Sequence, residues 1–310
     1  MKTIYKIREK AALRQRTIVL PEYNDERTIE AVKIIEKEGI ARVVLLTPDR
    51  IDKDVKERYI EEYYQAHKAN KDLDLEVVRK IFEDPLYYGA MMTQEGKVDG
   101  FVAGAVHTTA DVARSLIRCI GIDDRITIVS SCFIMSIPNC PYGDDGTVIF
   151  ADCGIIPDPN SRQLACIAIA ASELAAQVLE LRPRVALLSY STKGLAKGRC
   201  VDKVTEALAL AQEMAPGLLI DGELQADAAI VPDVAEIKSP DSPIGGKANV
   251  LIFPNLEAGN ICYKLVERLA NARAVGPLLL GLNRPASDLS RGCSADDIVD
   301  SVAVTSLRAK

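Results

Sequence analysis

TIVLPEYNDERTIEAVKIIEKEGIARVVLL, residues 17–46, is the stretch that indicates the fold class. The β-branched run Thr17–Leu20 predicts a strand, and Arg42–Leu46 predicts a second one. The residues between them predict a helix from about Asp25 to Glu38 that stops at Gly39. A strand, a helix and a strand in this order are typical of a mainly parallel sheet covered by helices, which predicts an α/β protein.

The same alternation continues along the chain, with a turn expected at 121–125 before the pattern restarts. Further strands are predicted at 98–105, 126–129, 185–188 and 249–253, and further helices at about 52–71, 75–95, 161–179, 201–214 and 259–271. A chain of 310 residues is long for one compact domain, so two lobes are expected. Because the sequence contains no long flexible linker, we expect ordered crossings and a cleft between the lobes.

Composition and charge exclude several classes of protein. Hydrophobic residues make up 48% and charged residues 26% of the chain, which is typical of a soluble globular protein. The charged start without an apolar run predicts no secretory signal, and no stretch reaches the roughly 18 apolar residues of a membrane span. A net charge of -6 disfavours nucleic acid as a partner. The eight cysteines without a C-x-x-C pair indicate reduced thiols and a cytoplasmic location, and the two histidines argue against a metal site.

Three loops that follow predicted strands carry hydroxyl groups and cations. In the first, His107, Thr108 and Thr109 precede a helix that carries Arg114. The free amides of a helix start could hold an anion there, but a simple N-cap with a solvated arginine is the preferred interpretation. The sequence contains neither a P-loop nor a G-x-G-x-x-G motif after a strand, so a P-loop kinase or ATPase is disfavoured and a Rossmann dinucleotide site has no local support.

The second loop offers Ser191, Thr192 and Lys193, either as ligands of a phosphate group or as an ordinary polar loop. The third is Ser287–Ile298. In it, Ser294 and Asp297 fit a capping box, which explains Asp297 structurally, while the preceding Ser290 and Arg291 could face a ligand. Cys293 beside Arg291 could be a nucleophile, although a buried structural thiol is the preferred interpretation.

Seven stretches of the chain, taken together, resemble the phosphate acetyl/butyryl transferase family, and its acetyl-transferring branch in particular. They are DPLYYGAMM (84–92), VAGAVHTTAD (102–111), FADCG (150–154), LSYSTKG (188–194), DGELQADAA (221–229), FPNLEAGNI (253–261) and DLSRGCSADDIV (288–299). They occur in order over nearly the whole chain, and seven long motifs are far more specific than any single short pattern.

The resemblance implies a fold, an assembly and a reaction. The fold is that of isocitrate and isopropylmalate dehydrogenases: a first lobe of 1–125 plus 277–310, an inserted lobe of 126–276, and an active-site cleft between them. The implied protein is a homodimer. The implied reaction is the reversible conversion of acetyl-CoA and phosphate to acetyl phosphate and CoA, which needs no metal or prosthetic group.

The resemblance also assigns roles to particular residues. It implies Ser290 and Arg291 as the catalytic serine and arginine, Asp297 as the general base, Arg114 and Arg268 as further functional arginines, and Cys140 as a cysteine near the site. With His107, Thr108, Thr109, Ser191, Thr192 and Lys193, these form the expected substrate-binding set. The stretch 66–71 departs from the family, because many members carry an arginine- and lysine-rich segment there.

Two other functions stay open from the sequence. One is transfer of butyryl or another longer acyl group, because one methylene changes binding by only about 1–3 kcal/mol. The other is a regulatory module that binds acetyl-CoA without catalysis. The presence of Ser290, Arg291 and Asp297 favours an enzyme.

Overall fold

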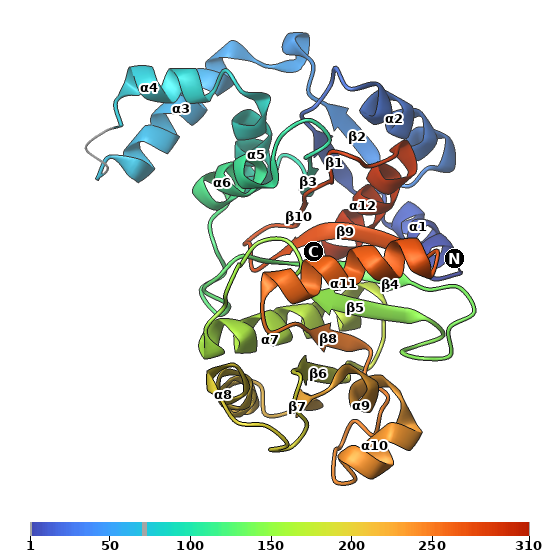
Figure 1. The fold of residues 1–310 in the computed structure, drawn as a ribbon. Coiled ribbons are helices and arrows are strands. Elements are labelled where there is room, and N and C mark those ends of the chain that lie inside the picture. The colour runs from blue at the N-terminus through green and yellow to red at the C-terminus, as the bar shows by residue number, and fades with distance from the viewer. Residues whose placement is uncertain (1, 70–72, 310) are drawn as a thin grey trace. The chain divides into compact units, whose positions relative to one another are not determined.

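A computed structural model describes residues 2–69 and 73–309 (Figure 1). The chain divides into two compact units. One comprises Arg8–Ile122 and the segment from Leu282 onward, and we call it the flanking unit. The other comprises Asp123–Gly281 and the residues up to Ile7, and we call it the middle unit. Helix α1 (Lys2–Arg14) runs across the division at Ile7. The predicted lobe boundaries stay a prediction.

The flanking unit is a parallel sheet with helices on both faces. Its strands lie in the order β2 (Arg42–Leu45), β1 (Thr17–Leu20), β3 (Gly100–Val102) and β10 (Ala286–Ser287). Helix α5 packs on β1 and β3, while α12 packs on β1, β3, β10 and α2. The remaining elements are α2 (Glu26–Glu38), a 3-10 turn η1 (Pro48–Arg50), α3 (Lys53–His67), α4 (Leu75–Ile81), α5 (Pro85–Glu95), α6 (Thr109–Cys119) and α12 (Ala295–Arg308).

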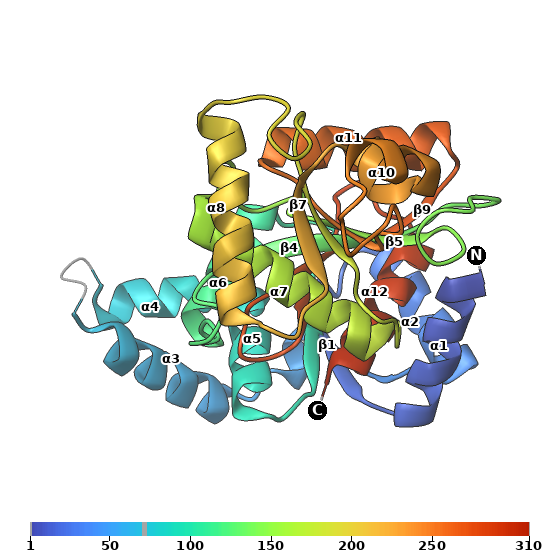
Figure 2. The same ribbon diagram turned by 90° about the horizontal axis from the view of Figure 1, so that it is seen from below.

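The middle unit has a mixed sheet. Its strands lie in the order β9 (Arg273–Leu280), β4 (Ser130–Ser136), β5 (Thr147–Ala151), β8 (Val250–Ile252), β6 (Val185–Leu188) and β7 (Ile220–Leu224). Strand β4 runs antiparallel to both β5 and β9, and the other pairs are parallel. Helices α7 (Ser161–Val178) and α11 (Leu256–Leu269) cover opposite faces of this sheet (Figures 1 and 2). The others are α8 (Arg199–Met214), α9 (Ala226–Ile230) and α10 (Pro232–Lys238).

The segment that indicated the fold class folds as predicted. Asp25 caps α2 by accepting the backbone N–H groups of Arg27 and Thr28, and Gly39 ends the helix in the left-handed region with φ of 64°. Glycine carries no Cβ, so it adopts that conformation at little cost. The two flanking strands pair in parallel, Thr17 opposite Arg42. The prediction of an α/β protein with a largely parallel sheet is therefore confirmed.

Three local predictions are wrong. The helix predicted at 75–95 is two helices, because Pro85 cannot donate a backbone N–H and starts a new helix that Asp84 caps. The strand predicted at 126–129 lies instead at Ser130–Ser136, because the backbone N–H groups of Ile126 and Thr127 bond to the Asp123 carbonyl in a turn. The strand predicted at 98–105 contains only Gly100–Val102.

Two negative findings apply to the described part of the chain. None of its helices combines the length and apolarity that a bilayer span requires. Nor does it contain a group of three or more His, Cys, Asp or Glu side chains placed to hold a metal ion.

Candidate functional site

Two of the three predicted loops meet at one edge of the flanking sheet. Strands β3 and β10 are parallel neighbours, with Val102 opposite Ser287, so their carboxyl ends lie side by side. The loop 103–108 leaves β3 and the loop 288–294 leaves β10 (Figure 1). Loops beyond the carboxyl ends of parallel strands are where ligands bind in open α/β sheets. The fold thus gathers His107, Thr108 and Thr109 with Ser290 and Arg291.

The Glu22 carboxylate holds the loop 103–108 in place. Its two oxygens accept the backbone N–H groups of Gly104, Ala105, Val106 and His107 at 2.9–3.0 Å. The side chain is only 3% exposed. Burial alone would raise the pKa of Glu22, but the hydrogen bonds from His107 and from these backbone groups outweigh it, and the pKa is lowered. Glu22 is therefore a buried anion whose role is to shape this loop.

His107 is held between two carboxylates. Its Nδ1 lies 2.8 Å from Glu22 Oε1, and its Nε2 lies 3.5 Å from Asp84 Oδ2. The hydrogen bond to Glu22 raises the pKa of His107, against the opposing effect of burial. With both ring nitrogens facing carboxylates, His107 acts first as a structural link between the loop and α5. A contact of His107 with substrate stays a prediction.

A single guanidinium, that of Arg27, joins both loops to α2. Nη1 donates to the carbonyls of Arg291 at 2.8 Å and Cys293 at 3.1 Å, and Nη2 donates to the carbonyl of Ala105 at 2.7 Å. The helix cap Asp25 accepts from Nε and Nη2 of the same side chain. Planar guanidinium groups can serve several acceptors at fixed angles. Arg27 therefore fixes the position of one loop relative to the other.

Replacing Arg27 by lysine should lower the kcat of a reaction catalysed at these loops by about 10²-fold. An ammonium group cannot reach all three carbonyls, so the two loops should shift relative to each other. Steady-state kinetics on the purified variant measures this. The matched control is Arg79→Lys, whose exposed pair with Glu57 at 3.1 Å should matter little. An unchanged kcat in Arg27→Lys would show that the loops are fixed by other contacts.

The threonines and Arg114 stand at the start of α6. Thr108 is the N-cap, and its hydroxyl accepts the N–H of Asp111 at 3.2 Å and donates to the Asp111 carboxylate at 2.6 Å. Arg114 is half exposed, with Nη1 2.8 Å from Asp111 Oδ1. The preferred interpretation, an N-cap with a solvated arginine, therefore describes these side chains in the absence of ligand. An exposed guanidinium about one and a half turns from a helix start can still contact an anion.

Ser290 and Arg291 lie exposed at the tip of the second loop. The Ser290 hydroxyl accepts the N–H of Gly292 at 3.3 Å. Within the described residues, the Arg291 guanidinium has neither an ion pair nor a hydrogen bond, so it is available to a ligand. Asp297 forms the predicted capping box: its Oδ2 accepts the N–H and the hydroxyl of Ser294, both at 2.8 Å. The capping-box prediction is confirmed.

Cys293 is a poor nucleophile in this structure. Its side chain is only 8% exposed, and burial raises the pKa of its thiol to about 11 despite the nearby Arg27. At neutral pH such a group is almost entirely protonated, and the thiol is far less reactive than the thiolate. The structure favours the preferred interpretation of Cys293 as a structural thiol.

The third predicted loop lies in the middle unit, after β6. Here the Ser191 hydroxyl donates to Glu223 at 2.9 Å, the Thr192 hydroxyl accepts the N–H of Gln225 at 2.9 Å, and Lys193 pairs with Asp221. These partners are all on β7 or directly after it. Ser191 and Thr192 are buried, so their hydroxyls fasten the loop to the neighbouring strand. Their role as phosphate ligands stays a prediction.

The two other predicted residues of the middle unit lie on separate elements. Arg268 is near the end of α11 with 81% of its side chain exposed, and its nearest acidic group is Glu267 on the same helix, at 3.8 Å. Cys140 is a partly buried free thiol in the segment between β4 and β5. Neither is fastened to the loop that carries Ser191.

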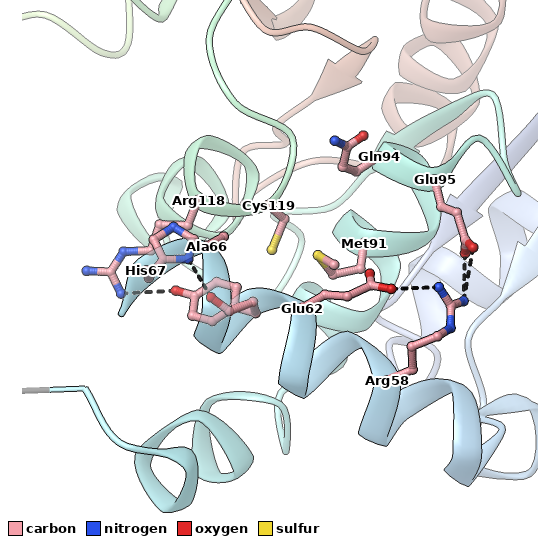
Figure 3. A pocket seen from close by; sticks show the side chains of 10 residues that line it. Arg58, Glu62, Ala66, His67, Met91, Gln94, Glu95, Arg118 and Cys119 are labelled. Atoms are coloured by element: carbon pink, nitrogen blue, oxygen red, sulfur yellow. Dashed lines mark hydrogen bonds and ion pairs between the residues drawn. The ribbon is translucent and has the colours of Figure 1, made fainter. Parts of the chain in front are cut away.

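A cavity of about 430 Å³ lies between α3, α5 and α6 of the flanking unit (Figure 3). Tyr63, Met91 and Cys119 contribute apolar surface to it, and Arg118 and His67 contribute polar groups. In the described chain, no carboxylate is paired with Arg118, which hydrogen-bonds to the Tyr63 hydroxyl at 3.5 Å and interacts with Tyr87. The cavity is also lined by Glu62 and Glu95, both paired with Arg58, so its lining is of mixed charge. Within the departing stretch 66–71, Ala66 and His67 line it, while Asn70 and Lys71 lie outside the described residues.

Sequence reasoning missed Glu22, Arg27 and Arg118. Glu22 lies between β1 and α2, and Arg27 lies in the first turn of α2, where ordinary loop and cap residues are expected. Their partners are about 80 and 265 residues away along the chain, and no local spacing reveals such contacts.

Comparison with known proteins identifies the family. A family model described as phosphate acetyl/butaryl transferase matches residues 2–306. The chain is 45% identical to a phosphate acetyltransferase of Thermoanaerobacterium thermosaccharolyticum, over 100% of both chains. It is 46% identical to one of Acetivibrio thermocellus, over 100% of this chain and 99% of that one. A solved phosphotransacetylase from Streptococcus pyogenes superposes with a TM-score of 0.88 at 37% identity, over 99% of this chain and 97% of that one. The resemblance read from the seven motifs is confirmed, and this chain belongs to the phosphate acetyl/butaryl transferase family.

Proposed function

We propose that this protein is a phosphate acetyltransferase, which moves an acetyl group reversibly between CoA and phosphate. The observation that carries the proposal is the match to proteins of that name over their full length. The loops after β3 and β10 support it, because they bring an exposed guanidinium, hydroxyl groups and a helix start to one edge of a sheet. Guanidinium groups bind phosphate oxygens strongly and with defined geometry.

The direction that forms acetyl-CoA tests this function directly. With acetyl phosphate and CoA, the purified protein should form a thioester, which is followed by its ultraviolet absorbance. We propose that no metal or prosthetic group takes part, so the rate should persist after dialysis against EDTA. A protein that forms no thioester from any acyl phosphate would contradict the proposal and favour a regulatory module that only binds acetyl-CoA.

We propose direct transfer in a ternary complex. Asp297 takes the proton of the CoA thiol, the sulfur attacks the carbonyl carbon of acetyl phosphate, and the carbon–oxygen bond to phosphate breaks. Arg291 binds the phosphate and the negative charge that develops on it, and Ser290 donates a hydrogen bond to the same group. Arg114 and Arg268, both exposed, bind anionic groups of the two substrates.

Proton transfer to an aspartate is uphill and needs an ordered site. An ordinary aspartic acid has a pKa of about 3.9 and an ordinary thiol about 8.5, a difference of about 6 kcal/mol. Alignment of two bound substrates can lower a barrier by about 7–11 kcal/mol, which covers that difference. The capping box contributes by fixing the orientation of the Asp297 carboxylate at the first turn of α12. Asp297 thus serves both as a member of the capping box and as the base.

The rival mechanism passes through an acetyl group on Cys293. Because burial keeps this thiol protonated, we expect Cys293→Ala to retain kcat within about threefold, with a modest loss of stability from the small cavity. Single-turnover experiments with labelled acetyl phosphate should leave no label on the wild-type protein after denaturation. Label on the protein, together with an inactive Cys293→Ala variant, would establish the rival.

Among acyl groups, acetyl is favoured. The full-length relatives are named for acetyl transfer, and none of the observations on this chain favours butyryl. Because a hydrophobic pocket discriminates one methylene by only about 1–3 kcal/mol, we expect slower turnover of propionyl groups and slower still of butyryl groups.

We propose that the protein is a homodimer that uses α11. The inner face of this helix packs on the core, with Tyr263 stacked on Phe133 at 4.1 Å between ring centres. The outer face exposes Ile261 (58%), Leu265 (53%) and Leu269 (80%), which recur every four residues and so form one stripe. A helix on a solvated surface normally carries polar residues there. A second copy of this chain would remove the stripe from water.

Replacing Leu265 by glutamate should convert the dimer to a monomer, because a charge at the centre of an apolar contact loses its hydration. Light scattering after gel filtration measures the mass. Ile237→Glu on α10 is the control: Ile237 is 84% exposed and lies outside the stripe, so the mass should not change. A wild-type protein that elutes as a monomer at micromolar concentration would refute the dimer.

We propose a cytoplasmic location. All eight cysteines are free thiols in the structure, including the exposed Cys200. Free thiols persist in reducing compartments, where CoA is also kept in its thiol form. The partners expected under this proposal are small molecules: CoA, acetyl-CoA, phosphate and acetyl phosphate.

A further inference from the structure

Asp288 is a buried acid that the mechanism above does not use. It directly follows β10 and precedes Ser290 by two residues. The residue is 0% exposed, and neither carboxyl oxygen has a hydrogen-bond partner of normal geometry in the described part of the chain. An ionised carboxylate without partners is very costly to bury, so such a group takes up a proton instead.

Gly104 packs directly against this acid. If Gly104 carried a Cβ, that atom would overlap Asp288 Oδ1 and would lie 2.5 Å from the N and 2.7 Å from the O of Leu289. The backbone of the loop 103–108 therefore rests on the Asp288 side chain and on the first peptide of the loop 288–294. On the other side, the Glu22 carboxylate holds the Gly104 N–H at 3.0 Å. The contact leaves no room for a hydration shell around a charged Asp288.

Electrostatic interactions also favour the protonated form of Asp288. Burial raises the pKa of Asp288 to about 7, and the nearby negative charge of Glu22 adds to that effect. The Thr109 hydroxyl at the start of α6 and the Leu289 N–H oppose it only partly. Glu22 is the charged group that acts on Asp288, and His107 is the titratable group hydrogen-bonded to Glu22. Below about pH 7 the two acids thus have opposite states: Glu22 is a hydrogen-bonded anion, and Asp288 is mainly the neutral acid.

We infer that Asp288 is a positioning residue that must stay uncharged: the neutral acid lets the two loops pack together and so fixes the backbone that carries Ser290 and Arg291. Loss of its proton puts an unpaired charge between the loops, and the loops separate to admit water. This inference rests on the proposed function for its effect on turnover. Its effects on protonation and stability are independent of that function.

The sign of the stability effect follows from the two pKa values. In the unfolded chain an aspartic acid titrates at about 3.9, and in the folded protein Asp288 titrates at about 7. The folded state therefore binds the proton more tightly, and the contribution of Asp288 to stability falls as pH rises from about 4 to about 7. Above that range the contribution is constant and unfavourable. Asp288→Asn, which keeps the shape without the charge, should lack this loss.

Infrared difference spectroscopy is the direct test. At pH 6 the wild type should show the carbonyl band of a protonated carboxylic acid, absent in Asp288→Asn, and the band should disappear as pH rises to 9. The melting temperature of Asp288→Asn should increase relative to that of the wild type between pH 5 and pH 8. Glu22→Gln is the matched control. It removes a hydrogen-bonded anion whose pKa is lowered, so the stability that it loses relative to the wild type should grow with rising pH, up to the ordinary glutamate pKa of about 4.3, and stay constant above it.

Turnover completes the test. The kcat of the wild type should fall with the same midpoint as the infrared band, while that of Asp288→Asn should stay level there. If Asp288→Asn does not fold, Thr109→Val serves instead, because loss of the hydroxyl should move the infrared midpoint to higher pH. No protonated band at pH 6, or a band that does not titrate, would overturn the inference even if the protein is an active acetyltransferase. Conversely, the band and the melting data can succeed in a protein without that activity.

Discussion

Replacing Asp297 by asparagine should lower kcat by about 10²- to 10⁴-fold, the usual contribution of a general base, while the protein stays folded. Asparagine keeps an oxygen that can accept the Ser294 hydrogen bonds, both 2.8 Å long in the structure, but it cannot take up a proton. Stopped-flow measurement of thioester formation gives the chemical step, and the binding of CoA measured separately should be unchanged.

Ser294→Ala is the matched control for Asp297→Asn. It removes the hydroxyl that caps α12 and leaves the carboxylate of Asp297 in place. We expect it to cost about 0.5–2 kcal/mol of stability with kcat reduced far less than in Asp297→Asn. If both variants lose the same activity, Asp297 acts through the helix start and the assignment as a base is wrong.

Replacing Gly104 by alanine should destabilise the protein by about 2–6 kcal/mol, the sum of backbone strain and overpacking. Its φ of +118° is one that alanine rarely adopts, and the new methyl group would meet Asp288 and the backbone of Leu289. Gly104 cannot easily move away from these neighbours, because Glu22 holds its backbone N–H from the other side. Urea denaturation at pH 6 measures the loss.

Gly194→Ala separates strain from overpacking. Gly194 also has a positive φ, +84°, but no atom of the described residues lies within 4 Å of the position its Cβ would occupy. We expect this variant to lose only about 1–2 kcal/mol, the cost of the left-handed conformation. Equal losses in the two variants would show that the close contact between Gly104 and Asp288 contributes little.

Local signals explain the part of the fold that the sequence could predict. The run 17–46 holds two β-branched strands, an aspartate cap and a terminal glycine, and each acts on its own neighbours along the chain. The capping box at Ser294 was predictable for the same reason. Strand β4 was misplaced because a turn at Asp123 holds Ile126 and Thr127, although their side chains are β-branched.

The candidate site was predictable only as a set of motifs. The family resemblance points to Ser290, Arg291 and Asp297, and the parallel pairing of β3 and β10 explains why the first two lie beside the His107 loop. The supporting contacts of Glu22 and Arg27 depend on residues distant in sequence. A pattern of residue types does not encode such contacts, and they became visible only in the folded chain.

The most direct test of the proposed function is the release of free thiol from acetyl-, propionyl- and butyryl-CoA, with and without phosphate. We predict rapid release from acetyl-CoA that depends on phosphate, slower release from the longer thioesters, and a large loss in Arg291→Ala with acetyl-CoA. Release that is independent of phosphate, or no release from any of the three, would contradict the assignment.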